Sequence, residues 1–167
     1  YFDVYDRIYE LIREDDGSSS FGAFWMWAPG RTIKVQCDIS AMLSPELFEE
    51  FALPWLAEQC ERVDYSLYHL DGSQAVQHLD MLLSIDALDV IEFTPDPNTP
   101  PGSNKHWYGM YERIRKAGKS IQVVDARKRE VLPLLDELGG KGFYFCVTDF
   151  TSEAELVEMY EAVKSYR

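Results

Sequence analysis

The stretch DYSLYHLDGSQAVQHLDMLLSIDALDVIEFT, residues 64–94, determines how we interpret the fold. Residues 64–72 and 89–95 are short runs rich in aromatic and aliphatic side chains, and each ends in Gly or Pro, which is typical of buried strands. Between them, residues 75–85 place apolar side chains at helical spacing. A strand, a helix and a second strand in this order predict a parallel βαβ unit.

The same alternation continues toward the C-terminus. Strands are predicted over residues 121–126 and 143–148, because both runs are short, apolar and rich in β-branched or aromatic residues. Helices are predicted over 107–118, 129–140 and 153–165, where apolar residues recur at helical spacing and glycines close the first two segments. Each strand is followed by a helix, as in a parallel β/α fold.

Upstream of this region the chain begins with a helix rather than a strand. Residues 1–14 have the spacing of an amphipathic helix, and the polar Gly/Ser segment 15–20 ends it. The bulky apolar run FGAFWMWAP, residues 21–29, suits a strand that is buried on both faces. We therefore expect this run to be the first of five parallel strands.

Two expectations concern the helices around the central unit. Ser44 and Pro45 have the residue types of a helix start, and Pro54 is expected to kink or divide the helix that follows. His78 and Asp80 lie on an amphipathic segment and are expected to face solvent.

The number of strands limits the choice of fold. Five βα units do not close a barrel, which needs eight, although a doubly wound sheet can stop at five. No glycine-rich phosphate loop follows any predicted strand, so the nucleotide-binding form of that sheet is unsupported. We predict an α/β fold, the C-terminal part of a TIM-type (β/α)8 barrel. It is one domain over residues 1–167, with a leading helix and loop at 1–20 and five βα units at 21–167.

Charge and composition disfavour several classes of function. The 16 basic and 29 acidic residues give a formal net charge of −13, which opposes binding to nucleic acid, anionic membranes or polyanionic substrates. The sequence has no apolar run long enough to span a bilayer. Its first residues are amphipathic and lack a basic-then-apolar pattern, so we expect no secretory leader. Cys37, Cys60 and Cys146 are odd in number and widely spaced, unlike a disulfide framework, so we expect a cytoplasmic setting.

Metal-ligating residue types gather at the C-terminal ends of the predicted strands, where function concentrates in parallel β/α folds. His69 and Asp71 end one strand, Glu92 lies near the end of the next, and Cys146 lies near the end of the last. His69 and Asp71 are two residues apart, so their side chains project from the same face. Imidazole, carboxylate and thiolate together suit zinc best. The spacing therefore predicts a Zn²⁺ site formed by these four residues.

Structural alternatives exist for three of these residues. His69 can be a hydrogen-bonded core histidine, Asp71 the cap of the next helix, and Cys146 an inert buried thiol. Glu92 is the hardest to explain in this way. A carboxylate within the apolar run Val90–Phe93 is costly to bury unless it meets a partner.

Three aspartates are candidates for catalytic side chains: Asp71, Asp125 and Asp38. Asp125 ends its strand, where capping the following helix is as good an explanation as substrate contact. Asp38 follows Val35-Gln36-Cys37 and either faces the same rim from a loop or holds a turn.

Several motifs in this order resemble the uroporphyrinogen decarboxylase superfamily. The first is DISAMLSPE, residues 38–46, followed by Phe48, Phe51 and Pro54-Trp55. The second is His69-Leu70-Asp71-Gly72 at the end of its strand. The likeness runs from residue 21 to the C-terminus with family-like intervals, and it implies the later strands of that family's eight-stranded barrel.

The resemblance implies one of two activities. One branch of the superfamily decarboxylates uroporphyrinogen without a cofactor, and the other consists of zinc-dependent methyltransferases that work with corrinoid proteins. The methyltransferase pattern is His-x-Cys-Gly on one strand, Glu on the next and Cys on the last. His69, Glu92 and Cys146 match it, but Asp71 stands where that branch has its middle Cys. An oxygen ligand makes zinc harder, which suits activation of an oxygen substituent at least as well as a thiol and makes a demethylase-like donor reaction attractive.

The hypothesis that these observations favour is zinc-dependent methyl transfer between a small-molecule donor or thiol and a corrinoid carried by a partner protein. Uroporphyrinogen decarboxylation is the first alternative, although the strand ends offer none of the arginines or lysines that a polycarboxylate needs. A non-catalytic barrel fragment is the second. An incomplete barrel also leaves unpaired strand edges, so we expect self-association through them.

Overall fold

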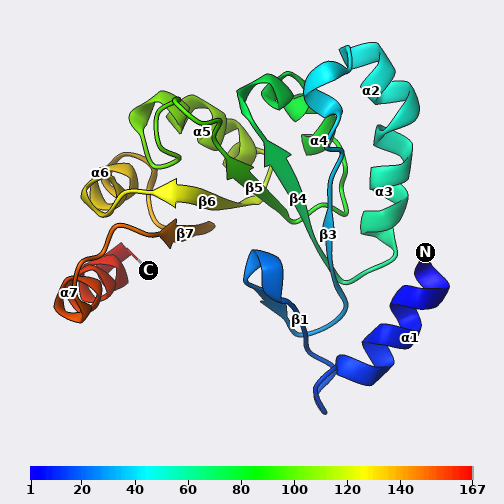
Figure 1. Ribbon diagram of the computed structural model, residues 1–167, viewed down its shortest axis with the longest axis horizontal. Coiled ribbons are helices and arrows are strands. Elements are labelled where there is room, and N and C mark those ends of the chain that lie inside the picture. The colour runs from blue at the N-terminus through cyan, green and yellow to red at the C-terminus, as the bar shows by residue number, and fades with distance from the viewer. Residues whose placement is uncertain (167) are drawn as a thin grey trace.

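The computed structural model describes residues 1–166 and has a single parallel sheet of five strands at its centre. The strands are β3 (Thr32–Val35), β4 (Tyr65–Asp71), β5 (Val90–Thr94), β6 (Ser120–Ala126) and β7 (Phe143–Val147). They follow one another across the sheet in the order in which they occur in the sequence. Figure 1 shows that they form a curved arc with a concave and a convex side. The α/β class and the parallel pairing predicted from sequence are confirmed.

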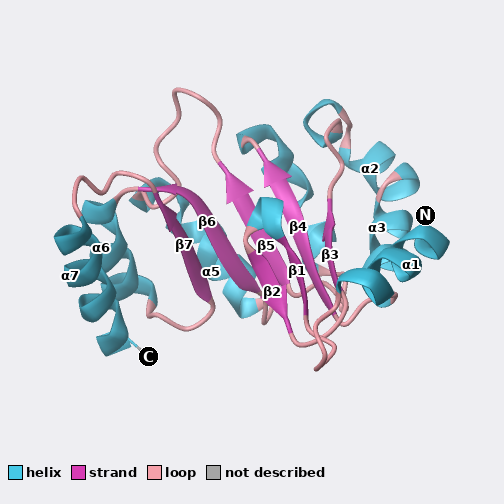
Figure 2. Ribbon diagram, turned by 60° about the horizontal axis from the view of Figure 1, so that its bottom comes forward, coloured by secondary structure: helices cyan, strands magenta, loops and turns pink. Residues whose placement is uncertain are grey.

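Helices cover the convex side of the arc (Figures 1 and 2). Most of them connect successive strands, as a parallel sheet requires, whereas the first helix precedes the sheet and the last follows its final strand. The helices are α1 (Phe2–Ile12), α2 (Pro45–Phe51), α3 (Leu53–Glu61), α4 (Leu79–Leu83), α5 (Tyr108–Lys116), α6 (Lys128–Leu138) and α7 (Glu153–Val163). The helix α1 precedes the sheet and is held near it by a hydrogen bond from the Tyr5 hydroxyl to the Thr32 carbonyl, at 2.8 Å.

The apolar run 21–29 is not the first strand of this sheet, so that prediction was wrong. The run belongs to an antiparallel hairpin in which β1 (Ser19–Phe21) pairs with β2 (Met26–Ala28), and the 3₁₀ turn Gly22–Phe24 lies between them. Trp25 reverses the chain with a left-handed backbone, at φ 49°. The first βα unit therefore begins at Thr32. An apolar run cannot distinguish a central strand from a segment that packs against a sheet face.

The hairpin lies on the concave side of the arc (Figure 1). It is tied to the sheet by Gln122, whose Nε2 donates to the Phe24 carbonyl at 2.9 Å. Ser19 adds a second connection, since its hydroxyl lies in hydrogen-bond contact with the hydroxyl of Thr32 on β3, at 3.1 Å.

The helix predicted to start at Ser44 does so, and Ser44 Oγ accepts a hydrogen bond from Leu47 N at 3.3 Å. This helix is divided as predicted, because α2 ends at Phe51 and α3 begins at Leu53 with Pro54 in its first turn. Proline lacks the N–H that would continue the helical ladder, which explains the break.

The expectation that His78 faces solvent was wrong. Its side chain is fully buried and stacks on Phe48, with ring centroids 4.2 Å apart. Nε2 of His78 also donates to the Ser40 carbonyl at 2.8 Å. Asp80, two residues later, is exposed and pairs with Arg113 at 2.6 Å. Helical spacing alone did not reveal that the segment around Ser40 covers this face.

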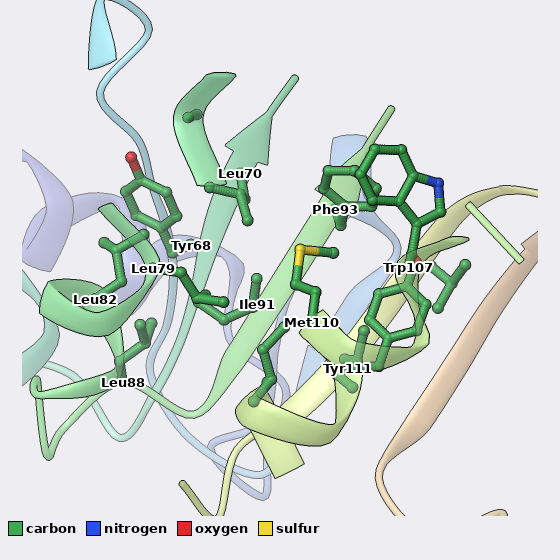
Figure 3. Packing of buried hydrophobic residues seen from close by; sticks show 14 of the residues in the cluster. Tyr68, Leu70, Leu79, Leu82, Leu88, Ile91, Phe93, Trp107, Met110 and Tyr111 are labelled. Atoms are coloured by element: carbon green, nitrogen blue, oxygen red, sulfur yellow. The ribbon is translucent and has the colours of Figure 1, made fainter. Parts of the chain in front are cut away.

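The main core lies between the convex face of the sheet and the helices (Figure 3). Strand side chains alternate between the two faces, so Ile91 and Phe93 enter this core while Val90, Glu92 and Thr94 face the concave side. Phe93 packs edge-on against Trp107, with ring centroids 4.7 Å apart. Among the described residues, no helix is long and apolar enough to cross a membrane.

Candidate functional site

The centre of the candidate site is a contact between two neighbouring strands. His69 on β4 and Glu92 on β5 are paired in register, and both project from the concave face. Nδ1 of His69 donates a hydrogen bond to Oε2 of Glu92. Oε1 of the same carboxylate accepts from the Thr94 hydroxyl at 2.6 Å. Glu92 is only 1% exposed, so these two hydrogen bonds supply the partners that its burial requires.

The hydrogen bond from Nδ1 fixes the orientation of the His69 ring. Nε2 then faces Asp71, whose Oδ2 is 4.0 Å away and whose side chain is 62% exposed. The His69 side chain is 17% exposed, so the ring lies partly open at the rim of the sheet. Asp71 caps no helix, because the turn after it begins at Gly72 without a side-chain cap.

Two effects oppose one another at His69. Burial of the ring lowers its pKa, but the hydrogen bond and the negative charge of Glu92, with a smaller contribution from Asp71, outweigh that effect. The pKa of His69 is therefore raised above its ordinary value.

Phe24 covers the His69 ring from the hairpin. The two ring centroids are 5.1 Å apart in an edge-to-face arrangement. The Lys34 ammonium lies 4.9 Å from the centroid of the same phenylalanine ring. Lys34 also donates to Gln36, which in turn donates to Asp38. Asp38 is thus the outer end of a polar chain along the β3 side of the site.

Cys146 lies on the same face but has a different partner. It is two residues beyond Tyr144, the register partner of Gln122, and its Sγ accepts a hydrogen bond from Gln122 Nε2 at 3.4 Å. Burial raises the pKa of the Cys146 thiol, and the charge of nearby Glu92 raises it further, while the Gln122 hydrogen bond opposes them. These effects favour the neutral thiol while the site holds no metal ion.

The four predicted zinc ligands thus occupy one edge of the sheet without surrounding a common point. Within residues 1–166, no three His, Cys, Asp or Glu side chains are placed so that they could hold one metal ion. Glu92 is occupied by His69 and Thr94, and Cys146 is bound to Gln122. The residues do not fit a shared zinc ion in this arrangement, and the presence of zinc stays a prediction.

Asp125 lies apart from the His69 pair. It adopts a left-handed backbone at φ 52°, beside an irregularity in the pairing of β6 with β7. Its Oδ1 pairs with Arg127 at 2.7 Å. Arg127 already pairs with this carboxylate, and Asp71 is the candidate aspartate whose contact with His69 is shown.

Sequence reasoning missed Asp96, which fixes the loop after β4. Its Oδ2 accepts from Ser73 N at 2.6 Å and from Ser73 Oγ at 2.5 Å. Gly72, at φ +81°, passes so close that a Cβ there would lie 2.5 Å from Asp96 Oδ1. Asp96 therefore sets the path of the chain just after His69 and Asp71.

Phe24, Lys34 and Gln122 were missed as well. The strand alternation would have placed Gln122 on the face of Glu92, but nothing in the sequence places Phe24 over His69.

Comparisons with known proteins add no assignment. No protein-family model matches the chain, and neither a search of curated proteins nor a search of solved structures found a match. The function must therefore be inferred from the geometry and from the motifs in the sequence.

Proposed function

We propose that the chain is the C-terminal part of an enzyme barrel of the uroporphyrinogen decarboxylase type. Two observations support this. The five strands follow the order of the sequence without a reversal, whereas a doubly wound sheet reverses its order at a switch point. The helices that connect the strands also cover one side of the arc only, as the outer layer of a barrel does (Figures 1 and 2).

The activity we propose is transfer of a methyl group from a small-molecule donor to a corrinoid acceptor carried by a partner protein. The observation that carries it is the hydrogen bond by which buried Glu92 holds His69 Nδ1. That bond directs Nε2 toward the rim, where a substrate would lie. When the methyl group passes to the corrinoid, the heteroatom of the donor keeps the electron pair of the broken bond. An N–H group at Nε2 of His69 stabilises that heteroatom by a hydrogen bond or by transfer of its proton.

The acidic site favours this activity over decarboxylation of uroporphyrinogen. The carboxylates beside the His69 ring are Glu92 at Nδ1 and Asp71 near Nε2, and Lys34 is the cation whose charge affects the ring. A substrate with many carboxylates would meet repulsion there. A neutral or weakly charged methyl donor would not.

The test uses protein expressed from its complete reading frame, mixed with reduced free corrinoid and four methyl donors: methanol, a methoxyarene, a methylated amine and a methylated thiol. Formation of methylcorrinoid is followed by absorbance. We expect activity with an oxygen-linked donor and a loss of about 100-fold or more in His69→Ala. His106→Ala is the matched control, because His106 is exposed on another loop. Equal rates in both variants, or conversion of uroporphyrinogen alone, would contradict the proposal.

Zinc is tested in the same assay. Because the four candidate ligands do not converge, the role given to His69 involves no metal. We expect the rate to survive removal of bound metal by a chelator. Loss of the rate on chelation, with recovery on adding Zn²⁺ and no recovery in Cys146→Ala, would show that the four residues do bind zinc. His69 would then be a ligand and not a proton donor.

A further inference from the structure

A hollow lies at the opposite end of the strands from His69. It is an open hollow with a volume of about 460 Å³, and it is bordered by the hairpin residues 24–28 and by residues at or next to the start of β4, β5, β6 and β7. Small-molecule sites commonly have volumes of about 300–1,000 Å³. Both of these walls come from this chain, the hairpin on one side and the first residues of the strands on the other.

Six aromatic residues line this hollow, and four of them have exposed side chains. Trp25 and Trp27 of the hairpin are 63% and 65% exposed, and Tyr65 of β4 and Tyr144 of β7 are 38% and 48% exposed. Large aromatic side chains on one cavity, accessible from solvent, are typical of ligand sites and not of a core.

The backbone of Trp25 supplies an independent observation. Its φ of 49° and ψ of 34° are left-handed, a conformation that a bulky residue adopts only at a cost in free energy. Glycine would occupy this turn without that cost. Strain of this kind is concentrated at functional sites, where the side chain contributes something other than stability.

The charge of the lining indicates which ligand fits. Asp89 is its one ionisable acid, and the lining contains no Lys, Arg or His. Asp89 Oδ2 accepts from Ser66 N at 2.7 Å. The nearby cation is Lys119, which lies outside the lining; its ammonium donates to the carbonyls of Ile85 and Leu88 and interacts with Asp89 through its charge alone. The net charge of −13 adds to the negative potential. An anion is disfavoured here and a cation is favoured.

We propose that this cavity binds a small organic cation, of the methylated ammonium class. Aromatic faces attract such cations through their quadrupoles, and a nearby carboxylate supplies the opposite charge. The hollow does not include His69 or Glu92, although Phe24 and Gln122 border both places, and the inference does not depend on methyl transfer.

The experiment compares choline with its uncharged carbon isostere, 3,3-dimethylbutan-1-ol, by calorimetric titration at low ionic strength. We expect choline to bind at least about tenfold more tightly, because only the cation gains from the rings and from Asp89. Asp89→Asn should weaken choline binding and leave the isostere unchanged. Equal affinities for the two compounds, or no binding of choline, would overturn the proposal.

Variants at the tryptophans locate the site. Trp27→Ala should weaken choline binding by about tenfold. Trp55→Ala is the matched control, because Trp55 is 64% exposed on α3, outside the cavity. Trp25→Gly should also weaken binding without lowering the unfolding midpoint, since glycine relieves the left-handed turn. An equal effect of Trp55→Ala and Trp27→Ala would place the binding elsewhere and contradict the proposal.

Discussion

Individual side chains account for the two features that distinguish the candidate site: a buried carboxylate with both oxygens occupied, and an imidazole fixed at one nitrogen. Glu92 would be costly to bury alone, and its hydrogen bonds to His69 and Thr94 reduce that cost. The same contacts determine which nitrogen of His69 faces the rim. The site is therefore rigid on the β5 side and open toward Asp71.

The raised pKa of His69 gives a direct test of this pairing. In Glu92→Gln the ring stays buried but loses the negative charge, so we expect its pKa to fall below that in the wild type. NMR titration of the imidazole C–H signals measures this, and the exposed His106 is an internal control. Identical His69 titrations in the two proteins would contradict the contact with Glu92.

The raised pKa of His69 also determines whether the free energy of unfolding rises or falls with pH. The folded-state pKa of His69 lies above the ordinary value of 6.5, so the folded state favours the protonated ring. The contribution of the His69–Glu92 pair to the free energy of unfolding is therefore fully present below the unfolded-state pKa of His69. It is lost as the pH rises through the folded-state pKa. The difference in unfolding free energy between wild type and Glu92→Gln should therefore shrink as the pH is raised over that window.

Gly72 is the second residue with a specific role. Gly72→Ala places a Cβ against the Asp96 carboxylate at a positive φ, and we expect it to cost about 1–3 kcal/mol of unfolding free energy. Gly109→Ala is the matched control: no atom lies within 4 Å of its added Cβ, and alanine favours the helix α5 by up to about 1 kcal/mol. Urea denaturation measures both changes. An unchanged free energy of unfolding in Gly72→Ala would mean that Asp96 does not hold this turn.

Among the elements, the helices show how the position of a proline decides its effect. Pro54 lies in the first turn of α3, where its missing N–H has no helical partner to lose. Pro133 lies inside α6, where it removes one hydrogen bond of the ladder. The two prolines therefore differ in what replacement should do.

We expect Pro133→Ala to stabilise the protein by about 1–2 kcal/mol, since the helix gains a hydrogen bond while the unfolded chain gains some entropy. Pro133 is exposed, so the change removes little packing. Pro54→Ala should change the unfolding free energy by no more than about 1 kcal/mol. Thermal or urea unfolding of the pair provides the measurement, and a destabilising Pro133→Ala would show that α6 needs its proline for another reason.

In the whole molecule, the sheet has two outer strands. Among the described strands, β3 pairs only with β4 and β7 only with β6, so each has an edge of backbone groups without a strand partner in the main sheet. The helix α1 also leaves Val4, Ile8 and Leu11 exposed. Open edges and apolar faces of this kind favour association with another chain.

We therefore expect the chain of residues 1–167 to self-associate as its concentration rises. Light scattering coupled to size exclusion, over a hundredfold range of concentration, would show a mass above 19.3 kDa at the upper end. The net charge of −13 opposes contact between copies, so added salt should strengthen the association. A constant monomer mass at every concentration and salt level would contradict the prediction.

The sequence by itself determined the parallel β/α class, the four strands from Tyr65 onward, the break at Pro54 and the edge of the sheet where polar residues gather. These follow from periodicity and from turn residues, which act over a few neighbouring positions. Only the tertiary structure decided that FGAFWMWAP is a hairpin on the concave face, that His78 is buried, and that Glu92 contacts His69 while Cys146 contacts Gln122. Each of these depends on which distant segment packs against a given face, and local spacing carries no information about that choice.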